Sequence, residues 1–257
     1  MNNRKTSYYL QLLEVFTIGE LKSRYKASLL GFLWIILYPL ITAIILNFIF
    51  GTFIKINTGG IPYFLFVFSG LVFWNFFQQS VALAKDSLIW NRELVVKTAF
   101  PKDVIPLSFV LSKIPDFFIS LLILLFFYLI AGFSLHSYQI LILLTVIPLF
   151  LFSAGLSMII SFTNAVFRDF GRIMEFLLMI FFYVTPIIYP DNFIPEKYRI
   201  FLLVNPLATL IIFAKNMIFN KKIMIDLFLI SLLISFVFFA IGIVFFKKFE
   251  KKITDLI

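Results

Sequence analysis

Residues 117–167 read FFISLLILLFFYLIAGFSLHSYQILILLTVIPLFLFSAGLSMIISFTNAVF and contain no Asp, Glu, Lys or Arg. The stretch is 51 positions long, whereas one transmembrane helix needs only about 20 apolar residues. A turn-like segment from Gly132 to Gln139 interrupts it, because Gly and Ser favour turns. The stretch therefore predicts two membrane-spanning helices joined by a tight hairpin.

The composition of the whole chain is typical of a membrane protein. Of its 257 residues, 62% are hydrophobic and 14% are charged, whereas a soluble domain averages about half apolar and a quarter charged. Several spans fill this length, so any soluble partner domain must be another chain. The formal charge of +9 is expected in cytoplasmic loops rather than on a nucleic-acid surface. With no Cys and one His, thiolate catalysis and Cys/His zinc sites are excluded.

Other charge-free stretches predict the remaining membrane helices. These are Ala27–Ile54, Ile56–Ala84, Phe176–Pro190, Ile200–Ala214 and Leu227–Phe246. The stretch that begins at Phe176 is short, but an extension back through Glu175 to Gly171 makes it long enough to cross.

The stretch Ile200–Ala214 has only 15 residues and contains the pair Asn205-Pro206. This favours a re-entrant or interfacial helical pair on the outer side, within an outer gate region at residues 191–222. We expect an all-α integral membrane protein with six transmembrane helices, an N-terminal interfacial helix and one domain, residues 1–257.

The distribution of basic residues predicts the orientation. With the N-terminus inside, the cytoplasmic segments hold 16 Lys and Arg residues and the outer segments hold six. Cytoplasmic loops of membrane proteins carry the excess of positive charge. We therefore expect both termini in the cytoplasm.

Residues 1–28 predict a cytoplasmic interfacial helix. Apolar side chains recur at helical spacing from Tyr9 to Phe16, and basic residues lie at the flanks. Lys22 and Lys26 are four residues apart and share one face of a helix, whereas Arg24 points elsewhere. We expect the two lysines to meet lipid phosphates or a partner, and Arg24 to approach the path of a substrate.

Three carboxylates, Asp116, Glu175 and Asp226, border the predicted spans. Each is a candidate gate or substrate contact. The stronger interpretation for two of them is a helical ion pair at the headgroup level: Lys113 lies three residues before Asp116, and Arg172 lies three residues before Glu175. The middle of the spans carries essentially no charge, which counts against ion-coupled transport.

The sequence offers no catalytic constellation. No Gly-Lys-Ser or Gly-Lys-Thr occurs, so the chain lacks a phosphate-binding P-loop. His136 lies in a predicted outer turn without an acidic residue to orient it. We expect no catalytic residue, metal ligand or cofactor in this chain.

The loop from residue 85 to residue 101 is the most polar internal stretch. It predicts a short amphipathic helix ended by Pro101, with Leu94 beside Arg92 and Glu93. Such a helix suits a groove on a cytoplasmic partner. A helix lying on the lipid surface fits the residues equally well.

Several short segments, in this order, resemble the transmembrane permease subunit of bacterial polysaccharide ABC exporters, in the type-2 ABC export permease family that handles O-antigen, capsule and teichoic acid. The segments are Leu21–Lys26, Leu30–Trp34 with Pro39, Ser69-Gly70, Trp74–Phe77, Phe100–Leu107, Arg168–Gly171, Thr185–Pro190 and Asn205–Leu207. Two departures are Gly19-Glu20, where the family often has Arg-Asp, and Asp103, where it often has Glu.

The resemblance implies a homodimer in the bacterial inner membrane, bound to two copies of a separate ATPase that holds ATP and Mg²⁺. The substrate it implies is a lipid-linked glycan, carried on undecaprenyl diphosphate. It assigns residues to three sites, namely a cytoplasmic gate at Lys22, Arg24, Tyr25, Lys26 and Trp34, a coupling helix at Arg92, Glu93 and Leu94, and an outer gate at Asn205 and Pro206.

Alternatives remain at this stage. The basic residues near the inner headgroups suit a diphosphate, and they suit anchoring to anionic lipid equally well. A related permease for a drug, a peptide or a small lipid is the first alternative function. A secondary transporter would require functional buried ionisable residues.

Overall fold

The computed structural model describes residues 2–26, 31–221 and 223–256, and every regular element in these ranges is helical. This confirms the predicted all-α class. Positions 27–30, where the first span was expected to begin, lie outside the described residues.

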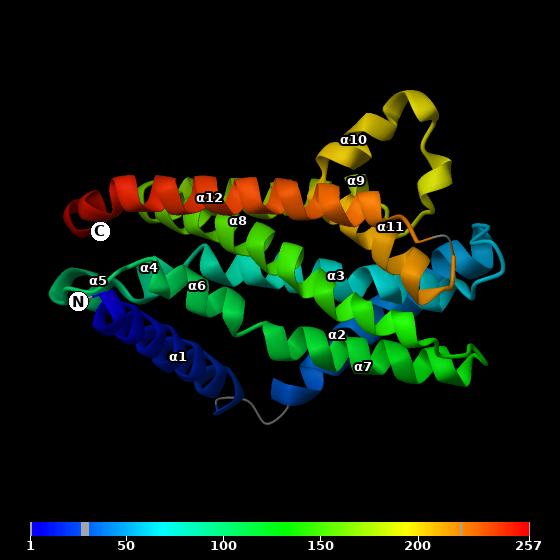
Figure 1. Ribbon diagram of the computed structural model, residues 1–257, viewed down its shortest axis with the longest axis horizontal. Helices are drawn as coiled ribbons and strands as arrows, with labels where there is room; N and C mark the ends of the chain where they lie inside the picture. Colours follow the sequence, from blue (N-terminus) through cyan, green and yellow to red (C-terminus); the bar gives the residue numbers. More distant parts are fainter. Residues whose placement is uncertain (1, 27–30, 222, 257) are drawn as a thin grey trace.

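Long helices lie side by side along one axis (Figure 1). The start of α1 (Asn2–Lys26) and the end of α12 (Ile225–Leu256) lie at the same end of this bundle, which we call the terminus end. The turn between α7 (Ile114–Ile130) and α8 (Val146–Val166) lies at the opposite end, which we call the hairpin end. The short helix α10 (Arg199–Val204) projects from one flank near the hairpin end.

Within the described ranges, five helical stretches are long and apolar enough to cross a membrane. They are formed by α2 (Gly31–Leu46) with the π-helical η1 (Asn47–Phe53), by α3 (Tyr63–Ala84), by α6 (Val104–Leu111) with α7, by the 3₁₀ segment η2 (Ser137–Thr145) with α8, and by α12. The hairpin predicted from the 51-residue stretch is confirmed. Gly132 makes its turn with a φ of 82°, a conformation that Gly adopts without strain.

A sixth stretch that runs along the bundle is α9 (Asp169–Val184), which is only 16 residues long. That length gives about 24 Å of helix, short of the roughly 30 Å hydrocarbon core. Its contacts nevertheless follow the whole length of α3. Glu175 pairs with Lys85, just after the last residue of α3, at 3.0 Å, and the carbonyl of Ile188 accepts a hydrogen bond from Tyr63, the first residue of α3, at 2.6 Å. The segment from α9 to Ile188 therefore runs antiparallel to α3.

The predicted re-entrant pair is present at the hairpin end. η4 (Glu196–Tyr198) and α10 lead into α11 (Pro206–Ile218) through a bend of 103° at Asn205. Residues before and after the pair, Asp191 and Lys221 among them, line one cavity. The chain thus enters and leaves the pair at the same end of the bundle, which is the arrangement expected of a re-entrant pair.

Two expectations about the polar loop were wrong. It forms two short helices, α4 (Ser87–Trp90) and α5 (Arg92–Lys97), rather than one helix ended by Pro101. The third span begins at Val104 rather than at Phe117. A single break at Ser112 and Lys113 separates α6 from α7, and the two helices together form one apolar stretch, Val104–Ile130.

Close packing of α8 on α12 depends on two glycines. A Cβ atom at Gly242 would lie 2.5 Å from the carbonyl oxygen of Gly155, and a Cβ atom at Gly155 would lie 2.5 Å from the carbonyl oxygen of Phe238. Small residues allow such backbone approach between membrane helices.

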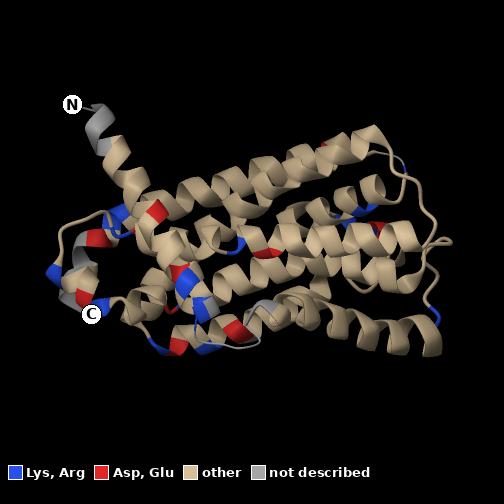
Figure 2. Cartoon of the chain, turned by 90° about the horizontal axis from the view of Figure 1, so that it is seen from below, with Lys and Arg blue, Asp and Glu red and all other residues tan. Residues whose placement is uncertain are grey.

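Charged residues gather mainly at the terminus end, and fewer lie at the middle of the bundle and at the hairpin end (Figure 2). This distribution agrees with the uneven count of basic residues in the sequence.

The re-entrant topology is tested with single cysteines, because the chain has no cysteine of its own. We expect Lys197→Cys and Lys221→Cys to react with an impermeant thiol reagent from the same side of the membrane. Lys97→Cys, on α5, should react only from the opposite side. Labelling of Lys221→Cys from the side of Lys97→Cys would mean that α10 and α11 cross the membrane.

Candidate functional site

The first helix, α1, is attached to α6 and the segment before it. The hydroxyl of Tyr9 donates a hydrogen bond to Oδ2 of Asp103 at 3.0 Å, and Phe16 stacks on Phe100 with ring centroids 5.5 Å apart. Burial raises the pKa of Asp103, although the hydrogen bond from Tyr9 acts in the opposite direction. One face of α1 thus packs against α6 and the segment before it. The sequence predicted only that this helix lies at the membrane interface.

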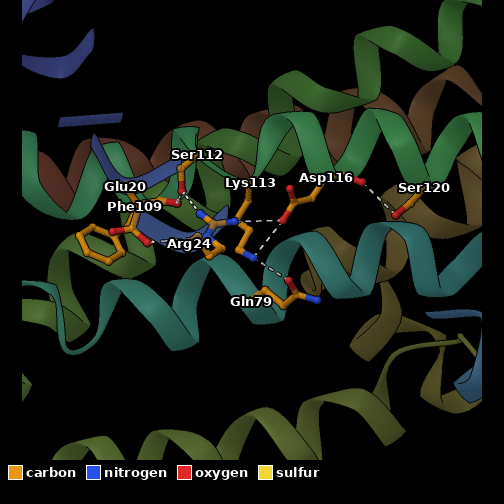
Figure 3. Close-up of polar contacts among 8 residues, drawn as sticks. All are labelled: Glu20, Arg24, Gln79, Phe109, Ser112, Lys113, Asp116 and Ser120. Carbon is orange, nitrogen blue, oxygen red and sulfur yellow. Dashed lines mark hydrogen bonds and ion pairs between the residues drawn. The ribbon is translucent and has the colours of Figure 1, made fainter. Parts of the chain in front are cut away.

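A cluster of charged and polar side chains joins the end of α1 to α7 and α3 (Figure 3). Arg24 donates from Nη1 to Oδ2 of Asp116 at 3.1 Å and from Nη2 to Oγ of Ser112. Lys113 donates from Nζ to the same Asp116 oxygen at 3.0 Å and to Oε1 of Gln79 at 2.8 Å. One carboxylate oxygen therefore serves two cations from different helices. We call these five residues the Asp116 cluster.

The Asp116 cluster lies inside the bundle. Lys113 is 6% exposed and Asp116 is 9% exposed. Gln79 lies six residues before Lys85, about 9 Å along α3 from its end. The predicted pair of Lys113 and Asp116 is confirmed, but its expected position at the headgroup level was wrong. The expectation of essentially uncharged spans was wrong for the same reason.

Such burial is costly unless each charge is paired. Removing an ion from water costs several kcal/mol even after relaxation, and good geometry with further hydrogen bonds compensates for it. Asp116 supplies the carboxylate that Arg24 and Lys113 share, while Arg24 also pairs with Glu20 on α1 at 3.7 Å. Asp116 is therefore the carboxylate that joins Arg24 to α7.

The other residues predicted for the cytoplasmic gate are not in the Asp116 cluster. Lys22 and Lys26 are exposed, whereas Arg24 is partly buried, which confirms that the lysines and Arg24 face different environments. Trp34 lies on α2 with 53% of its surface exposed. The side chain of Tyr25 lies outside the described residues.

The residues predicted for coupling lie together on α5. Arg92, Glu93 and Leu94 are exposed, while the neighbouring Val95 is fully buried and holds the helix on the bundle. Glu93 pairs with Lys97 at 3.0 Å across one helical turn. The helix therefore presents a mixed apolar and charged surface at the terminus end.

The predicted pair of Glu175 with Arg172 was wrong. Glu175 instead pairs with Lys85 at 3.0 Å, and Lys85 also pairs with Asp86 at 2.7 Å. Burial lowers the pKa of Lys85, but the hydrogen bonds to Asp86 and Glu175 more than offset this effect, and the pKa is raised. The pairing ties α9 to the end of α3.

The outer pair is organised by Asn205. Its Oδ1 accepts hydrogen bonds from the backbone N–H groups of Leu207 at 3.0 Å and Ala208 at 3.1 Å. Its Nδ2 donates to Oγ1 of Thr185 at 3.1 Å. Asn205 is therefore the N-cap of α11, and Pro206 occupies the first helical position, where a missing N–H costs nothing.

Sequence analysis missed Lys215, a residue on α11 that is only 6% exposed. Its Nζ donates to the carbonyls of Pro186 and Ile187, each at 2.9 Å, and lies 3.5 Å from the ring centroid of Phe66. Because α9 ends before Pro186, these carbonyls have no helical partner. No carboxylate lies within ion-pair distance of Lys215 among the described residues. The ammonium clamps α11 to the end of α9 and to α3.

The fold and these clusters define a multi-pass membrane protein without a nucleotide-binding motif. The sequence model of the ABC-2 type transporter family matches residues 11–219. The chain belongs to this family, which confirms the resemblance.

Relatives extend the comparison over nearly the full length. The chain is 34% identical to the O-antigen export system permease protein RfbA of Klebsiella pneumoniae, over 97% of this chain and 96% of the relative. It is 31% identical to a protein of the same name from Myxococcus xanthus, over 80% of each chain. It is 24% identical to the polysialic acid transport protein KpsM of Escherichia coli, over 76% of each chain.

The shared carboxylate in the Asp116 cluster has a measurable consequence. Asp116→Ala removes the carboxylate that Arg24 and Lys113 share and leaves them, among the described residues, only Glu20, Ser112 and Gln79 as partners. We expect a loss of about 3 kcal/mol in the free energy of unfolding. Arg24→Ala leaves the buried pair with Lys113 intact and should cost about 1 kcal/mol. Thermal unfolding in detergent, followed by tryptophan fluorescence, measures both variants.

Glu93→Ala is the matched control, because its ion pair with Lys97 is solvent-exposed and worth less than about 1 kcal/mol. Equal losses for Asp116→Ala and Glu93→Ala would contradict a stabilising role for the cluster.

Proposed function

We propose that this chain is the transmembrane subunit of an ATP-driven exporter of a lipid-linked polysaccharide in the bacterial inner membrane. The single observation that carries the proposal is the similarity to O-antigen export permeases, at 34% identity over 97% of the chain. The relation to KpsM, named for polysialic acid transport, supports a polysaccharide rather than a drug, a peptide or a small lipid.

In this proposal, two copies of the chain form the path and two copies of a separate ATPase supply the energy. The sequence has no P-loop motif, so ATP and Mg²⁺ are assigned to the partner and no cofactor to this chain. The exposed surface of α5 at Arg92, Glu93 and Leu94 is the docking site for that partner. The positive-inside rule then puts the terminus end, with both chain termini, in the cytoplasm.

The proposed substrate carries an undecaprenyl diphosphate, and Arg24 is its proposed contact. An Arg guanidinium offers two parallel donors that fit a phosphate, as it does here for Asp116 and Ser112. The diphosphate competes with Asp116 for these donors and so loosens α1 from α7. Lys22 and Lys26, which are exposed, hold α1 at the anionic lipid surface.

The buried ionisable residues do not favour a secondary transporter. The carboxylate of Asp116 is engaged by Arg24 and Lys113. Beyond it, the sequence from residue 117 to residue 167 contains no further carboxylate that would continue a proton or ion path along α7 and α8.

The proposed function is tested by deleting the chain in its host and measuring surface polysaccharide. Export should stop, lipid-linked glycan should accumulate inside, and a plasmid copy should restore export only together with an active ATPase. Undiminished surface polysaccharide after deletion would overturn the proposal, as would transport by the purified chain without ATP.

The proposed coupling surface is tested by Arg92→Glu. Charge reversal on the exposed face of α5 should reduce recovery of the ATPase with the purified chain several-fold, because it places repulsion at the contact. The amount of chain in the membrane should not change. Arg199→Glu, an exposed change near the hairpin end, serves as the control. Normal ATPase recovery together with normal export by Arg92→Glu would refute the assignment.

The proposed diphosphate contact is tested by Arg24→Lys. The variant keeps the charge but loses the forked donor, and one charge-assisted hydrogen bond of about 1.5 kcal/mol corresponds to roughly tenfold lower export. Lys22→Arg should export normally. Surface glycan is compared at matched levels of chain and ATPase. Equal export by both variants would leave membrane anchoring as the role of the basic residues.

A further inference from the structure

A cavity of about 450 Å³ opens at the hairpin end, and we call it the outer vestibule. Three separate segments form its walls: the loop after η1, the turn at η3 (Asp191–Phe193), and the turn that follows α11. The side chains that matter for its chemistry are Asn57, Asp191, Asn192, Phe193, Asn216 and Lys221.

The backbone of each wall is held in place. In the loop at residues 57–59, the side chain of Asn57 accepts a hydrogen bond from the N–H of Gly59 at 2.8 Å. The N–H of Phe193 donates to the carbonyl of Pro190 at 3.1 Å, and the N–H of Lys221 donates to the carbonyl of Asn216 at 2.9 Å. The vestibule is therefore formed before any ligand binds, which reduces the entropy cost of binding.

Several polar groups of the vestibule are unused by the protein. The side chains of Asp191, Asn192 and Lys221 make no hydrogen bond or ion pair with any described residue, although all three line the same cavity. Asp191 and Lys221 have opposite charges and do not pair with each other. Phe193 adds an aromatic face that is 53% exposed. Free donors, free acceptors and an apolar face thus converge on one space.

This combination suits a carbohydrate. Each sugar hydroxyl both donates and accepts hydrogen bonds, so it is matched by a site that offers acceptors, such as carboxylate and amide oxygens, beside donors, such as amide and ammonium N–H groups. The C–H face of a sugar ring packs on an aromatic ring such as Phe193. A single anion would not need Asp191, and an apolar ligand would leave Asn192 and the two charged side chains unsatisfied.

The vestibule also adjoins the hydrogen bonds that Lys215 donates to the carbonyls of Pro186 and Ile187. A smaller cavity beneath it shares Asp191, Asn216 and Lys221 with the vestibule and reaches Lys215. A ligand in the vestibule therefore lies next to the contact that holds α11 on α9.

We propose that the outer vestibule binds a segment of the exported glycan through its hydroxyl groups as the glycan leaves the protein. The inference rests on the proposed export function and adds a binding site at the outer end. A glycan bound there does not move back into the protein while the cytoplasmic gate returns to its initial state.

The test uses Asn192→Cys in the cysteine-free chain, purified as the complex with its ATPase. The probe is the lipid-free polysaccharide released from the producing strain, and the rate of labelling by a small thiol reagent is measured with and without it. We expect the probe to slow labelling of Asn192→Cys at least threefold. Glu196→Cys, on η4 outside the vestibule, should label at an unchanged rate. Dextran at the same mass concentration should have no effect.

Three outcomes would overturn the inference: an unchanged rate at Asn192→Cys, equal slowing at Glu196→Cys, or equal slowing by dextran. Deletion of the chain in the same strain separates these results from the export function. Lost surface glycan together with an unchanged labelling rate rejects the vestibule and retains the exporter. Normal surface glycan after deletion rejects both.

Recovery of the intact complex shows that each cysteine variant is folded. The double variant Asn192→Ala and Lys221→Ala supplies an independent readout, because it removes two polar side chains that make no hydrogen bond or ion pair with the described residues and leaves the Asp116 cluster intact. We expect several-fold lower export with normal ATPase recovery. Export equal to that of the parent chain would count against glycan binding at this site.

Discussion

A charge inside an apolar bundle must find a partner, and the carboxylate of Asp116 is the partner on which this structure depends. It accepts hydrogen bonds from Arg24 on α1 and from Lys113 at the start of α7. The free-energy cost of removing Arg24, Lys113 and Asp116 from water is compensated only while the three side chains are in contact. The same constraint explains Lys215, whose ammonium binds two backbone carbonyls that a helix break has left free. The first contact joins α1 to the crossing helices, and the second joins α11 to the end of α9.

The proposed coupling surface and the Asp116 cluster are linked through one continuous segment. Helix α5, anchored by the buried Val95, leads to Lys102 and Asp103 and then into α6, which ends at the cluster. Glu250 on α12 accepts a hydrogen bond from the N–H of Lys102 at 2.7 Å, and Tyr9 on α1 donates to Asp103. In the proposed mechanism, a displacement of α5 by the ATPase moves α6 and with it the groups that hold α1. The segment from α5 to α6 would itself link the proposed coupling surface to the Asp116 cluster.

Hydropathy and helical spacing predicted much of this fold, and long-range pairing accounts for what they missed. The spans follow from apolar runs, the break at Asn205 follows from a local motif, and the pair of Lys113 with Asp116 follows from their spacing. By contrast, Glu175 has its partner on another helix, and Lys215 binds carbonyls 28 and 29 residues away. No local pattern encodes such contacts. A lysine that directly follows the apolar stretch Ile200–Ala214 was the available signal for Lys215.

The central claim is that Asp116 and a lipid diphosphate compete for Arg24. It is tested most directly by the concentration of undecaprenyl diphosphate that half-stimulates ATP hydrolysis by the purified complex. Asp116→Asn weakens the protein's own acceptor and should lower that concentration, whereas Arg24→Lys removes the forked donor and should raise it. Opposite shifts are the predicted result. The same half-stimulating concentration for the parent and both variants would contradict the account.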